Sequence, residues 1–184
     1  MDPAYPLINN SRFWTGWMKN FLQTLLLLLC LSAPASTAAE ISGTLSRVQR
    51  VTDGDTIILE NGEKVRLIGV DTPEIHDEED RNKIHAQKYG QDPHRVDEYA
   101  IKAKNFTVEA VLQQKVRLEY DWQRRDKFGR TLAYVYREKD HFFLNAELVK
   151  QGYGFAYTRF PFKYLEQFRG YQVEARRNRK GMWG

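Results

Sequence analysis

Residues 51–74 read VTDGDTIILENGEKVRLIGVDTPE, and this stretch predicts most of a small β-meander. Residues 56–59 and 64–70 are mainly apolar, which is typical of strands. Asn61-Gly62 between them is a strong signal for a tight hairpin turn. Residues 42–51 alternate roughly between apolar and polar and add a preceding strand. Three consecutive strands are therefore expected at the start of the folded domain.

The remainder of the chain predicts two more strands, three helices and one long loop. The strands are expected at residues 115–120 and 131–137, and the helices at residues 93–113, 144–151 and 164–180. Residues 75–92 are rich in charge without periodicity and are expected to form the loop. Five strands with three helices favour an α+β fold built on a closed five-stranded β-barrel of the OB-fold type. Strand count alone leaves other small barrels open.

Two acidic clusters lie near the ends of the meander, DGDT at 53–56 and DTPE at 71–74. Arg66 lies between them, and Arg130 follows in a later basic loop. Carboxylates that converge can hold a hard divalent cation, and arginines beside them can clamp a phosphate. These are the parts needed to hydrolyse a phosphodiester. An isolated Asp-Gly-Asp, in contrast, is most often an ordinary turn.

The position of Arg66 relative to Asp71 imposes a geometric condition on this site. Five positions separate the two residues, so simple strand alternation would place their side chains on opposite faces. A bend or bulge near Gly69 is needed to turn Asp71 toward Arg66. We therefore expect the chain to bend just before the second acidic cluster.

Taken in order, the motifs resemble the staphylococcal nuclease (thermonuclease) family. The resemblance is carried by DGDT at 53–56, Arg66, DTPE at 71–74, DKFGR at 126–130, LAY at 132–134 and NAELV at 145–149. It covers the chain from about residue 45 to the end and implies an OB-fold barrel with three helices. It also implies a calcium-dependent endonuclease that cuts DNA and RNA with low sequence specificity, at the 5′ oxygen, leaving 3′-phosphate ends.

The resemblance assigns the acidic residues to a calcium ion (Ca2+). Asp55 and Asp71 are expected to bind it through their carboxylates, and Thr72 through its backbone carbonyl. Asp53 is expected behind them, reaching the ion through water. Calcium tolerates so few protein ligands because water and substrate phosphate fill its remaining positions.

The catalytic roles fall to two arginines and a glutamate. Arg66 and Arg130 are expected to bind the scissile phosphate through paired hydrogen bonds that strengthen as charge develops in the transition state. Glu74 is expected to orient or deprotonate the attacking water. A carboxylate near a cation is a weak base, so positioning of the water is the alternative to proton removal.

Contacts to the rest of the nucleotide are expected from Lys127, which would meet a neighbouring phosphate, and from Tyr157, which would stack on a base. The family commonly has tyrosine at the positions of Phe128 and Arg159, so these contacts differ here. Two other readings compete with the nuclease. A non-catalytic nucleic-acid-binding OB module would be expected to lose the carboxylates or arginines, and this chain keeps them. A sugar-binding barrel leaves the paired carboxylates unexplained.

Three histidines recur every nine residues in the charged region: His76, His85 and His94. This spacing matches no usual pattern of zinc ligands. We therefore expect all three side chains to be solvated, as we do for the acidic run at 77–80.

The first 39 residues are expected to be a cleaved secretory signal peptide, with the true start at Met18. A basic residue precedes an apolar run at 21–31, and small residues follow at 33–39, which is the order found in such signals. The apolar run is shorter than the roughly 20 residues that span a bilayer. A secreted or periplasmic protein without a stable membrane anchor is the prediction.

Residues 41–184 are then expected to form one nuclease-like domain that acts as a monomer. Cys30 is the only cysteine in the chain. It would leave with the signal peptide, so the exported domain would have no disulfide. The net charge of +4 for the whole chain suits an anionic partner such as DNA or RNA but does not identify one.

Overall fold

The computed structural model describes residues 43–75 and 80–184 of the chain. The expected signal peptide at 1–39, the expected start at Met18, and His76 lie outside the described residues. Residues Ser42–Gly184 form one compact unit. None of the helices in the described part of the chain is both long and apolar enough to cross a membrane.

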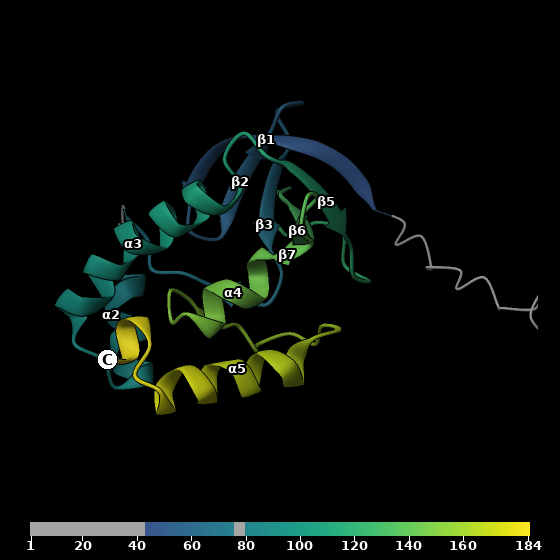
Figure 1. Ribbon diagram of the computed structural model, residues 1–184. Helices are drawn as coiled ribbons and strands as arrows, with labels where there is room; N and C mark the ends of the chain where they lie inside the picture. The colour runs from purple at the N-terminus through teal and green to yellow at the C-terminus, as the bar shows by residue number, and fades with distance from the viewer. Residues whose placement is uncertain (1–42, 76–79) are drawn as a thin grey trace, which may run out of the picture. The chain divides into compact units, whose positions relative to one another are not determined.

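A closed barrel of five strands forms one end of this unit (Figure 1). The strands are β1 (Thr44–Asp53), β2 (Thr56–Leu59), β3 (Lys64–Leu67), β5 (Lys115–Glu119) and β6 (Thr131–Arg137). The long β1 pairs antiparallel with both β2 and β5. The barrel closes where β3 runs parallel to β6. The expected α+β fold with a five-stranded barrel is therefore confirmed.

Alternating apolar side chains of these strands point into the barrel and make its core. Val48, Ile57, Leu59, Val65 and Leu118 are fully buried. Burying a side chain of this size stabilises the fold by about 1.5–3 kcal/mol. This rigid core fixes the strand ends from which the acidic clusters project.

Within the described residues four α-helices accompany the barrel, in place of the three expected, and Figure 1 shows them below and to the left of it. They are α2 (Arg81–Tyr89), α3 (Pro93–Val111), α4 (Leu144–Lys150) and α5 (Leu165–Arg177), followed by the 3-10 turn η1 (Gly181–Trp183). Helix α3 begins as predicted, with the Asp92 carboxylate accepting a hydrogen bond from the backbone N–H of His94.

Helix α2 lies where the sequence predicted a loop at 75–92, so that prediction was wrong for residues 81–89. The helix has no apolar stripe, and only Asn82 and Ala86 are buried. It ends at Gly90, whose φ of 65° is left-handed. Its attachment to the rest of the domain is largely polar and aromatic, and hydrophobic periodicity does not detect contacts of that kind.

The predicted third strand, 64–70, is split by a bend. Gly69 has a φ of +77°, and β4 (Val70–Asp71) begins directly after it. A Cβ at Gly69 would lie 2.6 Å from the ring of Phe162, so glycine meets both the backbone and the packing requirement. Two further short strands occur, β7 (Phe142–Phe143) and β8 (Phe155–Ala156), and β8 pairs with β4.

Asn145 on α4 stabilises this bend through hydrogen bonds to the backbone. Its side chain is fully buried and donates to the carbonyls of Ile68 (3.0 Å) and Ala133 (3.1 Å). Its carbonyl oxygen accepts from the backbone N–H of Val135 (2.9 Å). All of its bonds go to backbone groups of β6 and the bend, so Asn145 couples the barrel to the second acidic cluster.

Candidate active site

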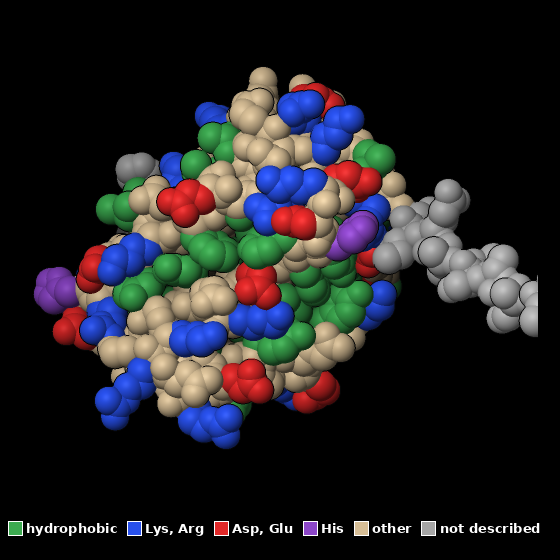
Figure 2. Space-filling model, in the orientation of Figure 1, with side chains coloured by type: hydrophobic (Ala, Val, Ile, Leu, Met, Phe, Trp, Pro, Cys, Tyr) green, Lys and Arg blue, Asp and Glu red, His purple; other side chains and the backbone are tan. Residues whose placement is uncertain are grey.

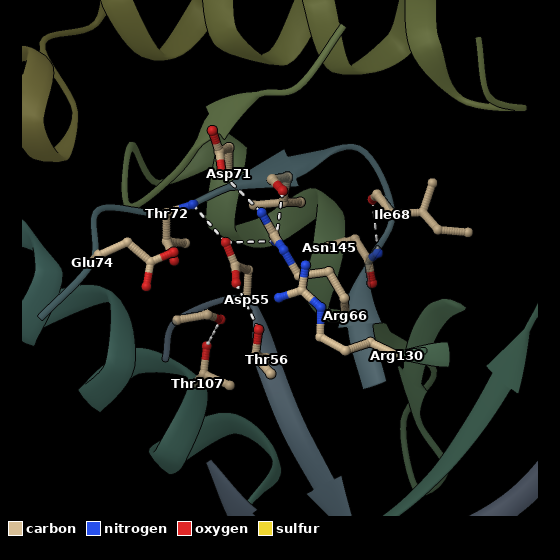
Figure 3. Close-up of polar contacts among 12 residues, drawn as sticks. Asp55, Thr56, Arg66, Ile68, Asp71, Thr72, Glu74, Thr107, Arg130 and Asn145 are labelled. Atoms are coloured by element: carbon tan, nitrogen blue, oxygen red, sulfur yellow. Dashed lines mark hydrogen bonds and ion pairs between the residues drawn. The ribbon is translucent and has the colours of Figure 1, made fainter. Parts of the chain in front are cut away.

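Arg66 is the centre of the site (Figure 3). It projects from β3, and its guanidinium contacts Asp55 at 2.6 Å and Asp71 at 2.8 Å. It also donates to the backbone carbonyl of Val70 at 2.8 Å. The bend at Gly69 thus turns Asp71 to the same side as Arg66, as the sequence required. The largely buried guanidinium of Arg66 therefore joins the two acidic clusters.

Asp55 lies beneath this arginine and is 1% exposed. One carboxylate oxygen accepts from the Thr72 backbone N–H (2.8 Å), and the other accepts from the Thr56 hydroxyl (3.0 Å). Gly54 beside it passes so close to α3 and the second cluster that a Cβ there would lie 2.8 Å from Ala103 and Thr72. Asp55 therefore connects the turn after β1 directly to the turn after β4.

Asp53 precedes this turn and is partly exposed. Burial and the neighbouring charge of Asp55 raise the pKa of Asp53 above its ordinary value. Two acidic side chains so close to each other would be stabilised by a cation.

Asp71 is anchored from two directions. Oδ1 accepts from Arg66, and Oδ2 lies 2.8 Å from Nε2 of His85 on α2. Burial alone would raise the pKa of Asp71, but the hydrogen bond from His85 and the charge of Arg66 outweigh it and hold the pKa below its ordinary value. Asp71 is thus kept as a carboxylate.

Glu74 is held through its backbone as well as its side chain. Asn82 on α2 accepts from the Glu74 N–H (2.9 Å) and donates to the Glu74 carbonyl (2.8 Å). The Glu74 carboxylate lies 3.1 Å from the guanidinium of Arg81. Burial, followed by the charge of Asp55, raises the pKa of Glu74 from 4.5 to about 7. Figure 3 shows Glu74 beside Asp55 and Thr72.

Arg130 directly precedes β6 and lines the same cleft as Arg66. Its Nε lies 2.6 Å from the Asp126 carboxylate, which also accepts from the Arg130 backbone N–H at 2.9 Å. Burial alone would raise the pKa of Asp126, but its hydrogen bonds with Arg130 hold the pKa below its ordinary value. Asp126 therefore fixes the direction of the Arg130 guanidinium.

The cleft has a volume of about 570 Å³. Of the residues that the sequence singled out for substrate, it brings together Arg66, Asp71, Lys127, Arg130 and Tyr157. Lys127 is exposed and Tyr157 is half-buried. Arg159, which stands at a common tyrosine position, also lines the cleft.

Sequence reasoning missed several residues of this cleft and its support. Trp122, Phe160 and Arg81 line the cleft, and the first two are 68% and 53% exposed. His85 was expected to be solvated, but its side chain is only 12% exposed and contacts Asp71; that prediction was wrong. His94 is exposed as expected. The spacing of Arg81 and His85, four residues apart before a Gly90 cap, was the one available signal of a helix face.

The donor set for a cation is sparse and consists of oxygen. Among residues 43–75 and 80–184, no three His, Cys, Asp or Glu side chains are grouped so that they would hold a metal ion by themselves. Asp55 and Asp71 both contact the guanidinium of Arg66, and the buried Thr72 hydroxyl has no hydrogen-bond partner in the described structure. Such a set fits a hard cation that also takes backbone, water and phosphate oxygens.

Comparison with known proteins agrees with this geometry. The model of the family described as staphylococcal nuclease homologue matches residues 64–184. A thermonuclease of Staphylococcus hyicus is 40% identical over 141 residues, covering 74% of each chain. A thermonuclease of Staphylococcus intermedius is 38% identical over 151 residues, covering 80% of each chain.

A further relative comes from outside the staphylococci. The endonuclease YncB of Bacillus subtilis is 37% identical over 142 residues, which is 74% of this chain and 60% of that protein. The barrel, the joined acidic clusters and these similarities all agree. The chain belongs to the staphylococcal nuclease family of hydrolases.

Proposed function

We propose that this protein is a calcium-dependent endonuclease that hydrolyses phosphodiester bonds of DNA and RNA with low sequence specificity. The observation that carries the proposal is Arg66, which joins Asp55 and Asp71 at 2.6 and 2.8 Å and lines one cleft with Arg130. The names of the relatives support nuclease activity. The calcium and the choice of substrate rest on the oxygen donors and on the family resemblance.

Asp55 and Asp71 would hold the calcium ion through carboxylate oxygens, and Thr72 through its backbone carbonyl, with Asp53 behind them. When bound, the ion supplies positive charge that polarises a phosphate oxygen. Arg66 contacts both carboxylates and offsets their charge. It therefore keeps two like charges close together until a cation takes part of that role.

Arg66 and Arg130 would bind the non-bridging oxygens of the scissile phosphate. Both guanidinium groups are held in place beforehand, Arg66 by the two carboxylates and the Val70 carbonyl, and Arg130 by Asp126 at 2.6 Å. Their remaining N–H groups would bind the phosphate. Donors that need no rearrangement stabilise developing charge effectively. Removing one such donor commonly lowers kcat by about 10²–10³.

Glu74 would orient the water that attacks phosphorus and accept its proton. Burial raises the pKa of Glu74, but a calcium ion held by Asp55 and Asp71 would lower it, so positioning of the water is the alternative to proton removal. The new bond forms between the water oxygen and phosphorus, and the bond to the 5′ oxygen breaks. The 5′ oxygen gains a proton from solvent, so the products are a 3′-phosphate and a 5′-hydroxyl.

Lys127 and Tyr157 would contact the nucleotides beside the scissile bond. Low sequence specificity is consistent with this surface, because Tyr157 offers a ring face and Lys127 a charge, and neither reads base edges. On the face drawn in Figure 2, lysines and arginines are interspersed with acidic side chains. No broad basic surface is therefore seen on the face that Figure 2 draws.

Export and a monomeric state are part of the same proposal. The order of basic, apolar and small residues in the first 39 positions supports a cleaved signal peptide and a secreted or periplasmic location. Residues 41–184 would be the mature nuclease domain.

Digestion of single-stranded DNA by Glu74→Gln and by Glu166→Gln tests the proposal. Glu166 lies on α5 with its side chain 79% exposed, so it is a matched carboxylate control. We expect Glu74→Gln to lose nearly all calcium-dependent cleavage and Glu166→Gln to cleave like the wild type. If the wild-type chain binds the DNA without cutting it, the non-catalytic OB module is the correct reading.

A further inference from the structure

We propose that His85 is a positioning residue for the calcium site, an inference that rests on the proposed function. His85 donates a hydrogen bond from Nε2 to Oδ2 of Asp71 and so fixes the carboxylate in the orientation that receives the cation. It does not touch substrate. Its effect passes entirely through Asp71.

The contact is short and well shielded. Nε2 of His85 and Oδ2 of Asp71 are 2.8 Å apart, with side chains 12% and 17% exposed. Oδ1 of Asp71 contacts Arg66, so the carboxylate is bound by one residue of β3 and one residue of α2. An ionised carboxylate has about four lone-pair sites, and these two bonds leave acceptor capacity for a cation.

The imidazole ring is itself held by the strand pair that carries Asp71. Its centroid lies 4.9 Å from that of Phe155 and 6.3 Å from that of Tyr89. Phe155 is the register partner of Asp71 between β4 and β8. Nδ1 is buried without a hydrogen-bond partner among the described residues. Ring packing and the one bond to Asp71 therefore determine where the histidine points.

Helix α2 extends this role to the second acidic residue of the same turn. Asn82 bonds to both backbone groups of Glu74, and Arg81 pairs with its carboxylate. One helix thus contacts the proposed calcium ligand and the proposed catalytic glutamate. This arrangement distinguishes His85 from a histidine that merely fills space in the core.

Loss of the hydrogen bond is expected to weaken calcium binding. Removing the outer partner of a metal-binding side chain typically costs 10–100-fold in metal affinity. At saturating calcium the chemistry is expected to recover most of its rate, because His85 contacts neither phosphate nor water in this scheme. The variant should therefore shift the calcium requirement more than it lowers kcat.

The test compares His85→Phe with His85→Gln. Phenylalanine keeps a ring against Phe155 without a donor, and glutamine restores an N–H donor at similar reach without the ring. His94→Phe on the exposed side of α3 is the matched control. The dissociation constant for calcium is measured by titration calorimetry without nucleic acid, and the calcium concentration for half-maximal cleavage is measured separately. His85→Leu replaces the phenylalanine variant if thermal unfolding shows that the larger ring does not fit.

We expect the donor-free variant to bind calcium 10–100-fold more weakly, His85→Gln to return to within a few-fold of the wild type, and His94→Phe to be unchanged. Wild-type affinity in the donor-free variant would overturn the inference alone, provided that the wild type still cleaves with calcium. If His85→Gln bound calcium as weakly as the donor-free variant, the inference would also be overturned, because the loss would then come from ring packing and not from the hydrogen bond. A wild-type chain that binds no calcium would overturn both this inference and the proposed metal.

Discussion

Arg66 has two tasks that are separable by mutation. It is 13% exposed and lies between Asp55 and Asp71, so its removal leaves two carboxylates without their counter-charge. Breaking a buried ion pair by removing one partner commonly costs about 3–5 kcal/mol. The same side chain is proposed to bind the scissile phosphate. A loss of activity in an Arg66 variant therefore has to be separated from a loss of folding.

Arg66→Met and Arg130→Met make that separation. We expect Arg66→Met to lower the free energy of unfolding by about 3–5 kcal/mol in urea without calcium. Arg130 is 27% exposed, pairs with Asp126 and lies over the ring of Phe128, so its loss should cost much less stability. At saturating calcium and substrate, kcat of Arg130→Met should fall by about 10²–10³. Equal stability losses in both variants would contradict the central position given to Arg66.

Glu74 predicts a pH dependence of stability. Its pKa in the folded, calcium-free chain is about 7, raised from 4.5. Between these values the folded chain retains a proton that the unfolded chain releases, so Glu74 lowers stability as pH rises. Glu74→Gln removes this loss. Both proteins are melted without calcium, and the melting temperature of Glu74→Gln minus that of the wild type should be larger at about pH 8 than at about pH 5. An equal difference at both pH values would contradict the raised pKa.

At the level of the elements, the site depends on the bend between β3 and β4. The sequence required this bend because Arg66 and Asp71 would otherwise face opposite ways, and Gly69 was the residue able to make it. Helix α2 was not predictable in the same manner. It is attached through His85, Asn82 and Arg81 to the polar residues Asp71 and Glu74, and periodicity detects apolar faces only.

Gly69→Ala tests the bend. A methyl group there meets Phe162 at 2.6 Å on top of an unfavourable φ of +77°. Gly62→Ala is the matched control, since its φ is +82° but a Cβ would have open space around it. Both variants should lose about 1 kcal/mol or more from backbone strain. Gly69→Ala should lose additional stability and most of its cleavage activity, measured by urea unfolding and DNA digestion. Equal effects of the two substitutions would rule out a special role for the bend.

At the scale of the whole molecule, the barrel was predictable because its strands alternate and are punctuated by clear turn signals. The closing parallel pair of β3 and β6 was not visible in local sequence, since Arg66 and Leu132 are register partners 66 positions apart. The acidic clusters and arginines were found from their residue types. The cleft around them, with Trp122 and Phe160, required the fold, because exposed aromatic residues carry no sequence signal of where they gather.

The most direct test of the whole account is a calcium titration of single-stranded DNA cleavage by the purified chain. Cleavage should stop when a chelator removes calcium and should return in full when calcium is restored, with 3′-phosphate ends on the products. Cleavage that persists in excess chelator would contradict the assignment of Asp55 and Asp71 to a calcium site.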